Sequence, residues 1–105
     1  MEAVGNAMRR QVMVGYDISD AVRLRAVART VEDFGDRIQF SVFVCEVGKR
    51  DLAVLKQRLL AIIKPSEDQV VLMDLGPVHD EDRGKLVADV LGRPVTLRNT
   101  RGMVF

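Results

Sequence analysis

Residues 13–20 read Met-Val-Gly-Tyr-Asp-Ile-Ser-Asp, and this stretch decides how the first part of the chain folds. Residues 11–16 are mostly apolar, β-branched or aromatic, which predicts a buried central strand. That strand delivers the carboxylate of Asp17 to its end. Several basic residues follow closely in the sequence: Arg23, Arg25 and Arg29. A potential metal ligand beside potential phosphate contacts suggests nucleic-acid chemistry.

Two helices and three more strands are expected after this first strand. The first helix should be capped by Ser19 or Asp20 and stopped by Gly35. Residues 36–47 form an extended run too long for one strand, so they predict two strands in a hairpin or a bent ribbon. A second helix starts near Asp51 and ends before Pro65. Its apolar stripe comprises Leu52, Leu55, Leu59 and Ile62, widened by Leu60 and Ile63. Residues 68–75 predict a further buried strand.

The predicted order is strand, helix, strand, strand, helix, strand, which is typical of an α+β, ferredoxin-like β-α-β-β-α-β fold. We expect this domain to span residues 11–75. Residues 1–10 lack apolar periodicity and are expected to be a flexible leader. Residues 76–105 are expected to form a C-terminal tail, with a polar loop over 76–84, helical spacing over 85–91 and an extended end from residue 95.

Length and composition limit the chain to one small domain. It has 105 residues, of which 48% are hydrophobic, and a net charge of +1. Attraction to nucleic acid must therefore come from local clusters of basic residues. The single Cys45 excludes an intrachain disulfide and is expected to be a buried thiol. We find no run of the roughly 18 apolar residues that a membrane span needs, so a cytoplasmic protein is expected, with no membrane partner.

Asp17 is the first candidate for chemistry, because a carboxylate at the end of a core strand can be held rigidly where the sheet meets solvent. Mg²⁺ commonly uses only one or two carboxylates and takes its other ligands from water and substrate phosphate. Two copies of Asp17 facing across a dimer axis would then hold Mg²⁺ or another divalent cation. The alternative is an aspartate that caps a helix or a turn, a common role before a helix.

The remaining candidates are basic, hydroxyl and aromatic side chains. Arg23, Arg25, Arg29 and Arg37 are candidate contacts to nucleic acid, although a solvated helix face paired with acidic residues is the simpler explanation. Ser41 can bond a phosphate if it points out of the core. Phe43 can pack at an interface, although its residue type favours the core. The only histidine, His79, lies among acidic residues and suggests no catalytic pair.

The segment Tyr16-Asp-Ile-Ser-Asp20, then Arg23 and Arg25, and the segment Gly35-Asp-Arg-Ile-Gln-Phe-Ser-Val-Phe43 resemble one family. This is the second core CRISPR-associated protein family, a small adaptation subunit also described as a metal-dependent endonuclease. The resemblance covers about residues 12–75 and implies a ferredoxin-like fold, magnesium at Asp17 and a symmetric homodimer. It also implies that the last strand swaps into the partner's sheet, with Val95 and Leu97 at the interface.

Two features depart from the family pattern. Many relatives carry an acidic residue where this chain has Val44, although Glu46 follows two positions later. This puts a carboxylate role at that position in doubt. The tail after Leu75 matches only loosely, which leaves the swapped segment open.

The resemblance supports two functions of different classes. The first is an adaptor that bridges copies of the CRISPR integrase subunit and holds pre-spacer duplex DNA. The second is a magnesium-dependent endonuclease acting on RNA or DNA, with Asp17 as catalytic residue and metal ligand. We place the adaptor first, since a single metal ligand per chain is a small set of residues for catalysis. A toxin-like ribonuclease of the related ferredoxin-fold group is the alternative.

Overall fold

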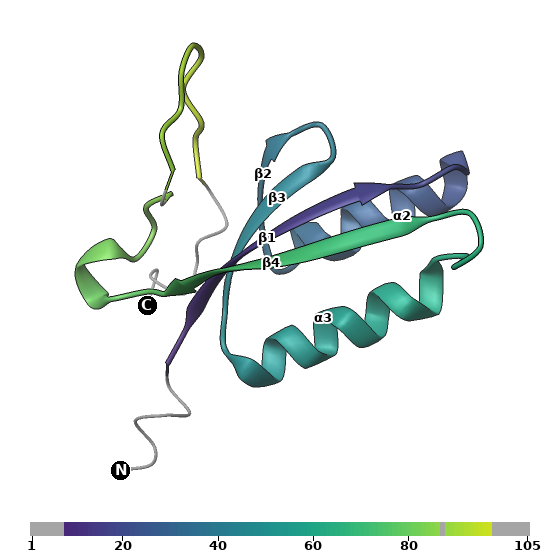
Figure 1. Ribbon diagram of the computed structural model, residues 1–105, viewed down its shortest axis with the longest axis horizontal. Helices are drawn as coiled ribbons and strands as arrows, with labels where there is room; N and C mark the ends of the chain where they lie inside the picture. Colours follow the sequence, from purple (N-terminus) through teal and green to yellow (C-terminus); the bar gives the residue numbers. More distant parts are fainter. Residues whose placement is uncertain (1–7, 87, 98–105) are drawn as a thin grey trace.

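The protein folds into one four-stranded antiparallel sheet with two helices on one of its faces (Figure 1). The computed structural model describes residues 8–86 and 88–97. The elements are β1 (Arg10–Asp17), α2 (Ala21–Glu32), β2 (Gly35–Gln39), β3 (Val42–Val47), α3 (Lys49–Ile62), β4 (Gln69–Pro77) and the 3₁₀ helix η1 (Asp80–Asp82). The strands lie in the order β2-β3-β1-β4. The predicted β-α-β-β-α-β order is confirmed.

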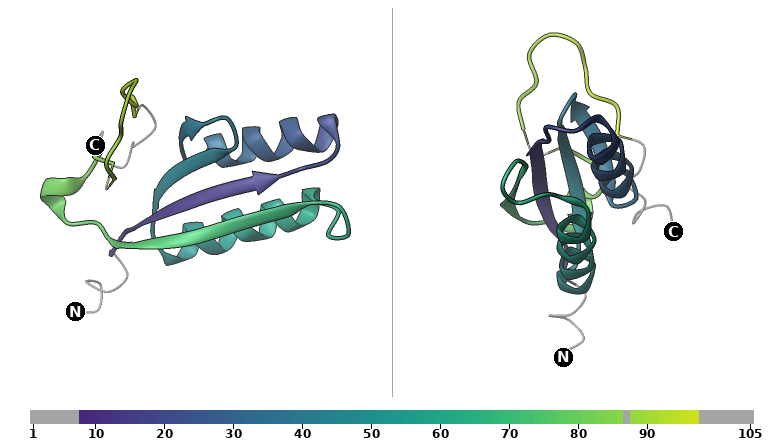
Figure 2. Two further views of the ribbon diagram at one scale, coloured as in Figure 1. Left: turned by 45° about the horizontal axis from the view of Figure 1, so that its top comes forward. Right: turned by 90° about the vertical axis from the view of Figure 1, so that its right-hand side faces the viewer.

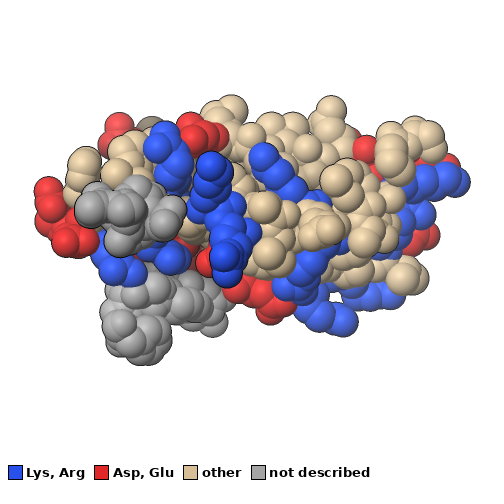
Figure 3. Space-filling view, turned by 90° about the horizontal axis from the view of Figure 1, so that it is seen from below, with Lys and Arg blue, Asp and Glu red and all other residues tan. Residues whose placement is uncertain are grey.

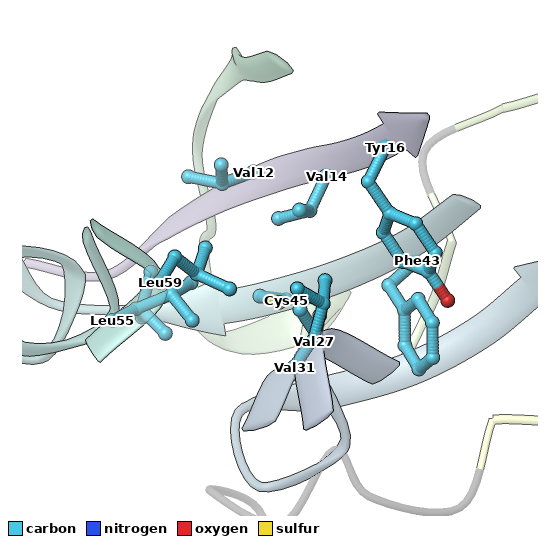
Figure 4. Close-up of a cluster of buried hydrophobic side chains, with 10 residues drawn as sticks. Val12, Val14, Tyr16, Val27, Val31, Phe43, Cys45, Leu55 and Leu59 are labelled. Atoms are coloured by element: carbon cyan, nitrogen blue, oxygen red, sulfur yellow. The ribbon is translucent and has the colours of Figure 1, made fainter. Parts of the chain in front are cut away.

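The core lies between the sheet and the two helices. Alternate residues of β1 point toward the helices, because successive side chains of a strand face opposite sides. They meet residues of α2, α3 and β3 in one cluster, which includes Val12, Val14, Tyr16, Val27, Val31, Phe43, Cys45, Leu55 and Leu59 (Figure 4). Each fully buried aliphatic side chain of this kind stabilises the fold by about 1.5–3 kcal/mol.

Among the described residues, no helix covers the opposite face of the sheet (Figure 2). The register pairs Met13 of β1 with Met73 of β4, and Asp17 with Gln69, so these four residues share that face. Val71 and Met73 keep 45% and 48% of their surface exposed. The prediction of a buried strand over residues 68–75 is therefore wrong in its burial, because β4 is an edge strand covered on one face only. We call this surface the open face.

Two predictions about the helices differ from the structure. The first helix ends at Glu32, and Gly35 is the first residue of β2 rather than a helix stop. A Cβ on Gly35 would lie 2.1 Å from the carbonyl oxygen of Val44, so glycine is needed there because two backbones approach closely. Leu60 does not widen the apolar stripe of α3, since 67% of its surface is exposed.

The start of the chain also differs from the prediction. Residues 1–7 of the expected leader lie outside the described residues, but β1 begins at Arg10. The side chain of Arg9 donates a hydrogen bond to the carbonyl oxygen of Glu46, in β3. Arg10 pairs with Asp74 of β4 at 2.7 Å. The folded domain therefore includes residues that the sequence had assigned to a leader.

The tail after β4 is attached to the sheet by polar contacts. The side-chain amide of Gln11 donates to the carbonyl oxygen of Lys85 at 3.0 Å, and the backbone N–H of Gly84 donates to the carboxylate of Glu46 at 3.2 Å. Among the described residues the predicted helical spacing over 85–91 forms no helix, and Val95 and Leu97 belong to no strand. Residues 98–105 of the predicted swapped strand lie outside the described part of the chain.

Two predictions about the chain as a whole can be checked directly. Cys45 is buried, as expected, with 1% of its surface exposed, and burial raises the pKa of its thiol to about 12. Across residues 8–86 and 88–97, we find no helix that is both long and apolar enough to cross a membrane.

Candidate metal and nucleic-acid site at the end of β1

Asp17 is the last residue of β1, and its side chain is exposed. Within the described residues its carboxylate makes no hydrogen bond and no ion pair. The helix-capping alternative for Asp17 is wrong, because Asp20 caps α2 by accepting a hydrogen bond from the backbone N–H of Arg23 at 2.9 Å. The sheet therefore presents Asp17 at the end of the open face as a carboxylate that no other described residue engages.

The loop that follows Asp17 is held by a buried carboxylate from another part of the chain. The side chain of Asp68, just before β4, has no exposed surface. It accepts hydrogen bonds from the backbone N–H groups of Ser19 at 3.0 Å and Lys64 at 2.8 Å. The guanidinium of Arg23 donates to the same carboxylate through Nε at 2.7 Å and Nη2 at 3.2 Å. Asp68 thus joins the β1–α2 loop to the α3–β4 loop.

This network gives Arg23 a structural contact that the sequence did not predict. The hydrogen bond from Arg23, together with those from the two backbone N–H groups, lowers the pKa of Asp68 well below its usual range. Arg23 also lies 3.3 Å from Glu67, whose pKa is lowered chiefly by hydrogen bonds from Lys64 and Ser19. Arg23 is therefore largely engaged, with 24% of its side chain exposed. A phosphate contact by Arg23 stays a prediction.

Arg25 and Arg29 differ from Arg23, because both are exposed on α2 and neither forms an ion pair with another described residue. Arg37 lies in β2, with its guanidinium 3.9 Å from the carboxylate of Glu32. More basic residues lie on or beside α3: Lys49, Arg50, Lys56, Arg58 and Lys64. Figure 3 shows the molecule from below the view of Figure 1, and on this face Lys and Arg side chains are spread out with Asp and Glu side chains between them. Of the residues on or beside α3, Arg58 pairs with Asp33 at 2.9 Å and Lys64 pairs with Glu67 at 3.0 Å.

The turn between β2 and β3 lies against the end of β1. The backbone N–H of Tyr16 donates to the carbonyl oxygen of Ser41 at 3.0 Å, and the Tyr16 hydroxyl donates to that of Phe40 at 3.5 Å. Ser41 is half-buried. Phe40 has 73% of its surface exposed. The sequence analysis did not single out Phe40, because its exposure depends on the position of the turn, which no Asn-Gly or Asp-Gly pair marks.

One of the three predicted interface positions lies in the core. Phe43 has no exposed surface and packs against Tyr16 with a distance of 6.1 Å between ring centres. Its assignment to an interface is wrong, because the side chain fills the core. Val95 and Leu97 are half-buried in the tail, where their interface role stays a prediction.

One chain supplies too few oxygen ligands to surround a magnesium ion, so the remaining ligands would come from water, substrate or a second chain. Among the described residues, we find no cluster of three or more His, Cys, Asp or Glu side chains that could hold a metal. Asp17 is a single oxygen donor, and Mg²⁺ usually retains several waters while using one or two carboxylates. The residues present therefore fit a magnesium ion held by Asp17 together with water, substrate phosphate or a second Asp17.

Comparison with known proteins gives one consistent family. The sequence profile of the CRISPR associated protein Cas2 family matches residues 10–83. CRISPR-associated endoribonuclease Cas2 1 of Rhodospirillum rubrum is 32% identical over 93 residues, covering 89% of this chain and 88% of the relative. CRISPR-associated endoribonuclease Cas2 of Geobacter sulfurreducens is 32% identical over 73 residues, covering 70% and 77%.

Solved structures show the same architecture. Cas2 of Streptococcus pyogenes, at 33% sequence identity, superposes with a TM-score of 0.64 and covers 78% of this chain and 99% of its own. A hypothetical protein from Thermus thermophilus, at 26% identity, superposes with a TM-score of 0.71 and covers 86% of this chain and 99% of its own. The four-stranded sheet with two helices is thus a fold that these proteins share.

Proposed function

Because this chain belongs to the CRISPR-associated Cas2 family, we propose that it is a homodimeric subunit of CRISPR adaptation that bridges integrase dimers and holds pre-spacer duplex DNA. One observation carries this proposal: the open face combines exposed apolar side chains with the carboxylate of Asp17. Val71 and Met73 supply the apolar surface, and the register places Asp17 on the same side of the sheet.

A second copy of this chain suits the open face. Antiparallel sheets that bury one face against a core and leave the other to water usually carry polar side chains on the exposed face. The open face differs, because it carries the apolar side chains of Met13, Val71 and Met73. A two-fold axis through this face would bury these side chains twice and bring the two copies of Asp17 toward each other.

Nucleic-acid binding in this proposal relies on phosphate contacts. Arg25 and Arg29 are exposed, and no described residue pairs with either of them, so a phosphate can bind them without breaking an existing ion pair. Arg37 and Ser41 lie on the strand and turn next to the end of β1 and can extend the contact. Binding of this kind carries little base specificity and falls steeply with salt.

Magnesium-dependent cleavage of RNA or DNA is the second candidate function. It is favoured by the carboxylate of Asp17, which no described residue pairs with, and by the names of the relatives, which are endoribonucleases or an endonuclease. Asp17 would hold the ion, while nearby arginines would orient and neutralise the phosphodiester backbone. A bound magnesium ion lowers the pKa of a water ligand and neutralises charge on the phosphate.

Spacer acquisition in cells that carry the integrase and a repeat array tests which function comes first. Asp17→Ala should preserve insertion of new spacers if bridging depends on surfaces rather than on a metal. Deletion of residues 95–105 should weaken dimerisation or integrase docking and reduce insertion. Loss of insertion with Asp17→Ala, at normal protein level and normal complex formation, would make metal chemistry the primary function.

A further inference from the structure

Phe40 is an exposed aromatic side chain at a position where folding does not require one. It occupies the two-residue turn between β2 and β3, where small and polar residues are the usual choice. With 73% of its surface exposed, its ring contributes little to the core. An exposed ring of this kind is suited to contact with another molecule.

The guanidinium group of Arg37 lies over the ring of Phe40. The guanidinium carbon of Arg37 lies 5.8 Å from the ring centre of Phe40 and 5.1 Å from that of the buried Phe43. Arg37 also donates a hydrogen bond through Nη1 to the carbonyl oxygen of Phe40 at 2.9 Å. These contacts connect the exposed ring to the core through Arg37. A ring fixed in advance loses little conformational freedom when a ligand stacks on it.

The location of this ring also points to a ligand class. Contacts from Tyr16 place the turn beside the end of β1, where Asp17 is the next residue. The register pairs Arg37 with Phe43, whose side chain lies on the helix-covered side of the sheet. A second copy docked on the open face would therefore leave this side accessible. Asp17 and the turn that carries Phe40 therefore lie at the same end of the sheet, where one nucleotide chain can approach both.

We propose that Phe40, supported by Arg37, is a stacking platform for an unpaired nucleobase. This inference rests on the proposed nucleic-acid-binding function and adds to it a contact with single strands and with the frayed ends of a duplex. Stacking on aromatic rings is the usual way in which proteins hold unpaired bases, and an adjacent arginine adds attraction to the strand. A fully paired duplex hides the faces of its bases and gains nothing from this ring.

The absence of tryptophan from the sequence allows a direct optical test. Phe40→Trp places the only tryptophan of the full-length chain at the platform, and its fluorescence should be quenched by a single strand of about 12 nucleotides. Leu60→Trp is the matched control, because Leu60 is 67% exposed but lies on α3. Its fluorescence should change little when the same strand binds.

Affinity measurements on Phe40→Leu separate stacking from charge. This variant keeps an apolar side chain but removes the ring, so single-strand affinity should fall about 5- to 150-fold at every salt concentration. The slope of affinity against salt should stay unchanged, because no phosphate contact is lost. Affinity for a blunt duplex should match that of the wild type.

Three outcomes would overturn the platform, and they can be distinguished. Wild-type affinity of Phe40→Leu for single strands would remove the platform while leaving the proposed function intact. Binding of no nucleic acid by the wild type would refute both. Loss of integrase binding by Phe40→Leu, with single-strand affinity unchanged, would identify a protein anchor instead.

Discussion

Replacing Met73 with alanine tests whether the open face is the dimer interface. Complete burial of a methionine side chain is worth about 1.5–3 kcal/mol. Met73 keeps 48% of its surface exposed, so a partner could gain roughly half of that amount, about 0.7–1.5 kcal/mol per copy. A two-fold interface uses the residue twice, which gives about 1.5–3 kcal/mol and a dimer Kd about 10- to 150-fold higher.

Light scattering over a dilution series would measure this change in the dimer Kd. The monomer should keep its thermal stability, because the lost contacts lie outside the core. Leu60→Ala serves as the control, since it removes an exposed leucine from α3 without touching the open face. An unchanged dimer Kd in Met73→Ala would show that dimerisation does not use this face. A weakened dimer in Leu60→Ala would place the interface on the helices.

Three further predictions concern the candidate site. Asp17→Asn should lower magnesium-dependent cleavage by at least about 10- to 100-fold, because replacing even a residue that only hydrogen-bonds to a metal ligand costs that much activity. Circular dichroism should show an unchanged fold. Asp68→Asn should lower the melting temperature at pH 7. Because the pKa of Asp68 is lowered in the folded state, its carboxylate stabilises the fold fully at pH values above the ordinary pKa of 3.8. The stability advantage of the wild type should decline as the pH falls below 3.8 and is lost as the pH passes the lowered pKa. Combined Arg25→Ala and Arg29→Ala should reduce the salt slope of duplex binding by about 1.8, and an unchanged slope would place the DNA elsewhere.

The fold was predictable because its hydrophobic patterns are strong. The apolar residues of β1 alternate or run together as a central strand requires, and the helix stripes follow helical spacing. The burial of β4 was not predictable, because Val71 and Met73 look like core residues in sequence. Their exposure depends on β4 being an edge strand with helices on one side only, which is a property of the whole sheet.

The candidate site was predictable in part. Asp17 follows a core strand, and that pattern placed its carboxylate at the end of the sheet. The engagement of Arg23 with Asp68 was hidden, since 45 residues separate them in the chain. Gly35 was misread for a similar reason, because the backbone of β3 that demands a glycine there belongs to another strand. Contacts between distant segments decide these roles, and local patterns do not report them.

The deep burial of Cys45 makes this chain its own reporter of global unfolding. A thiol that is 1% exposed, with a pKa raised to about 12, holds almost no thiolate at neutral pH and should resist alkylation while the domain stays folded. Its rate of modification would then follow the opening of the core between sheet and helices. As the only cysteine, it also leaves the surface clear for thiol-directed dyes attached at engineered positions.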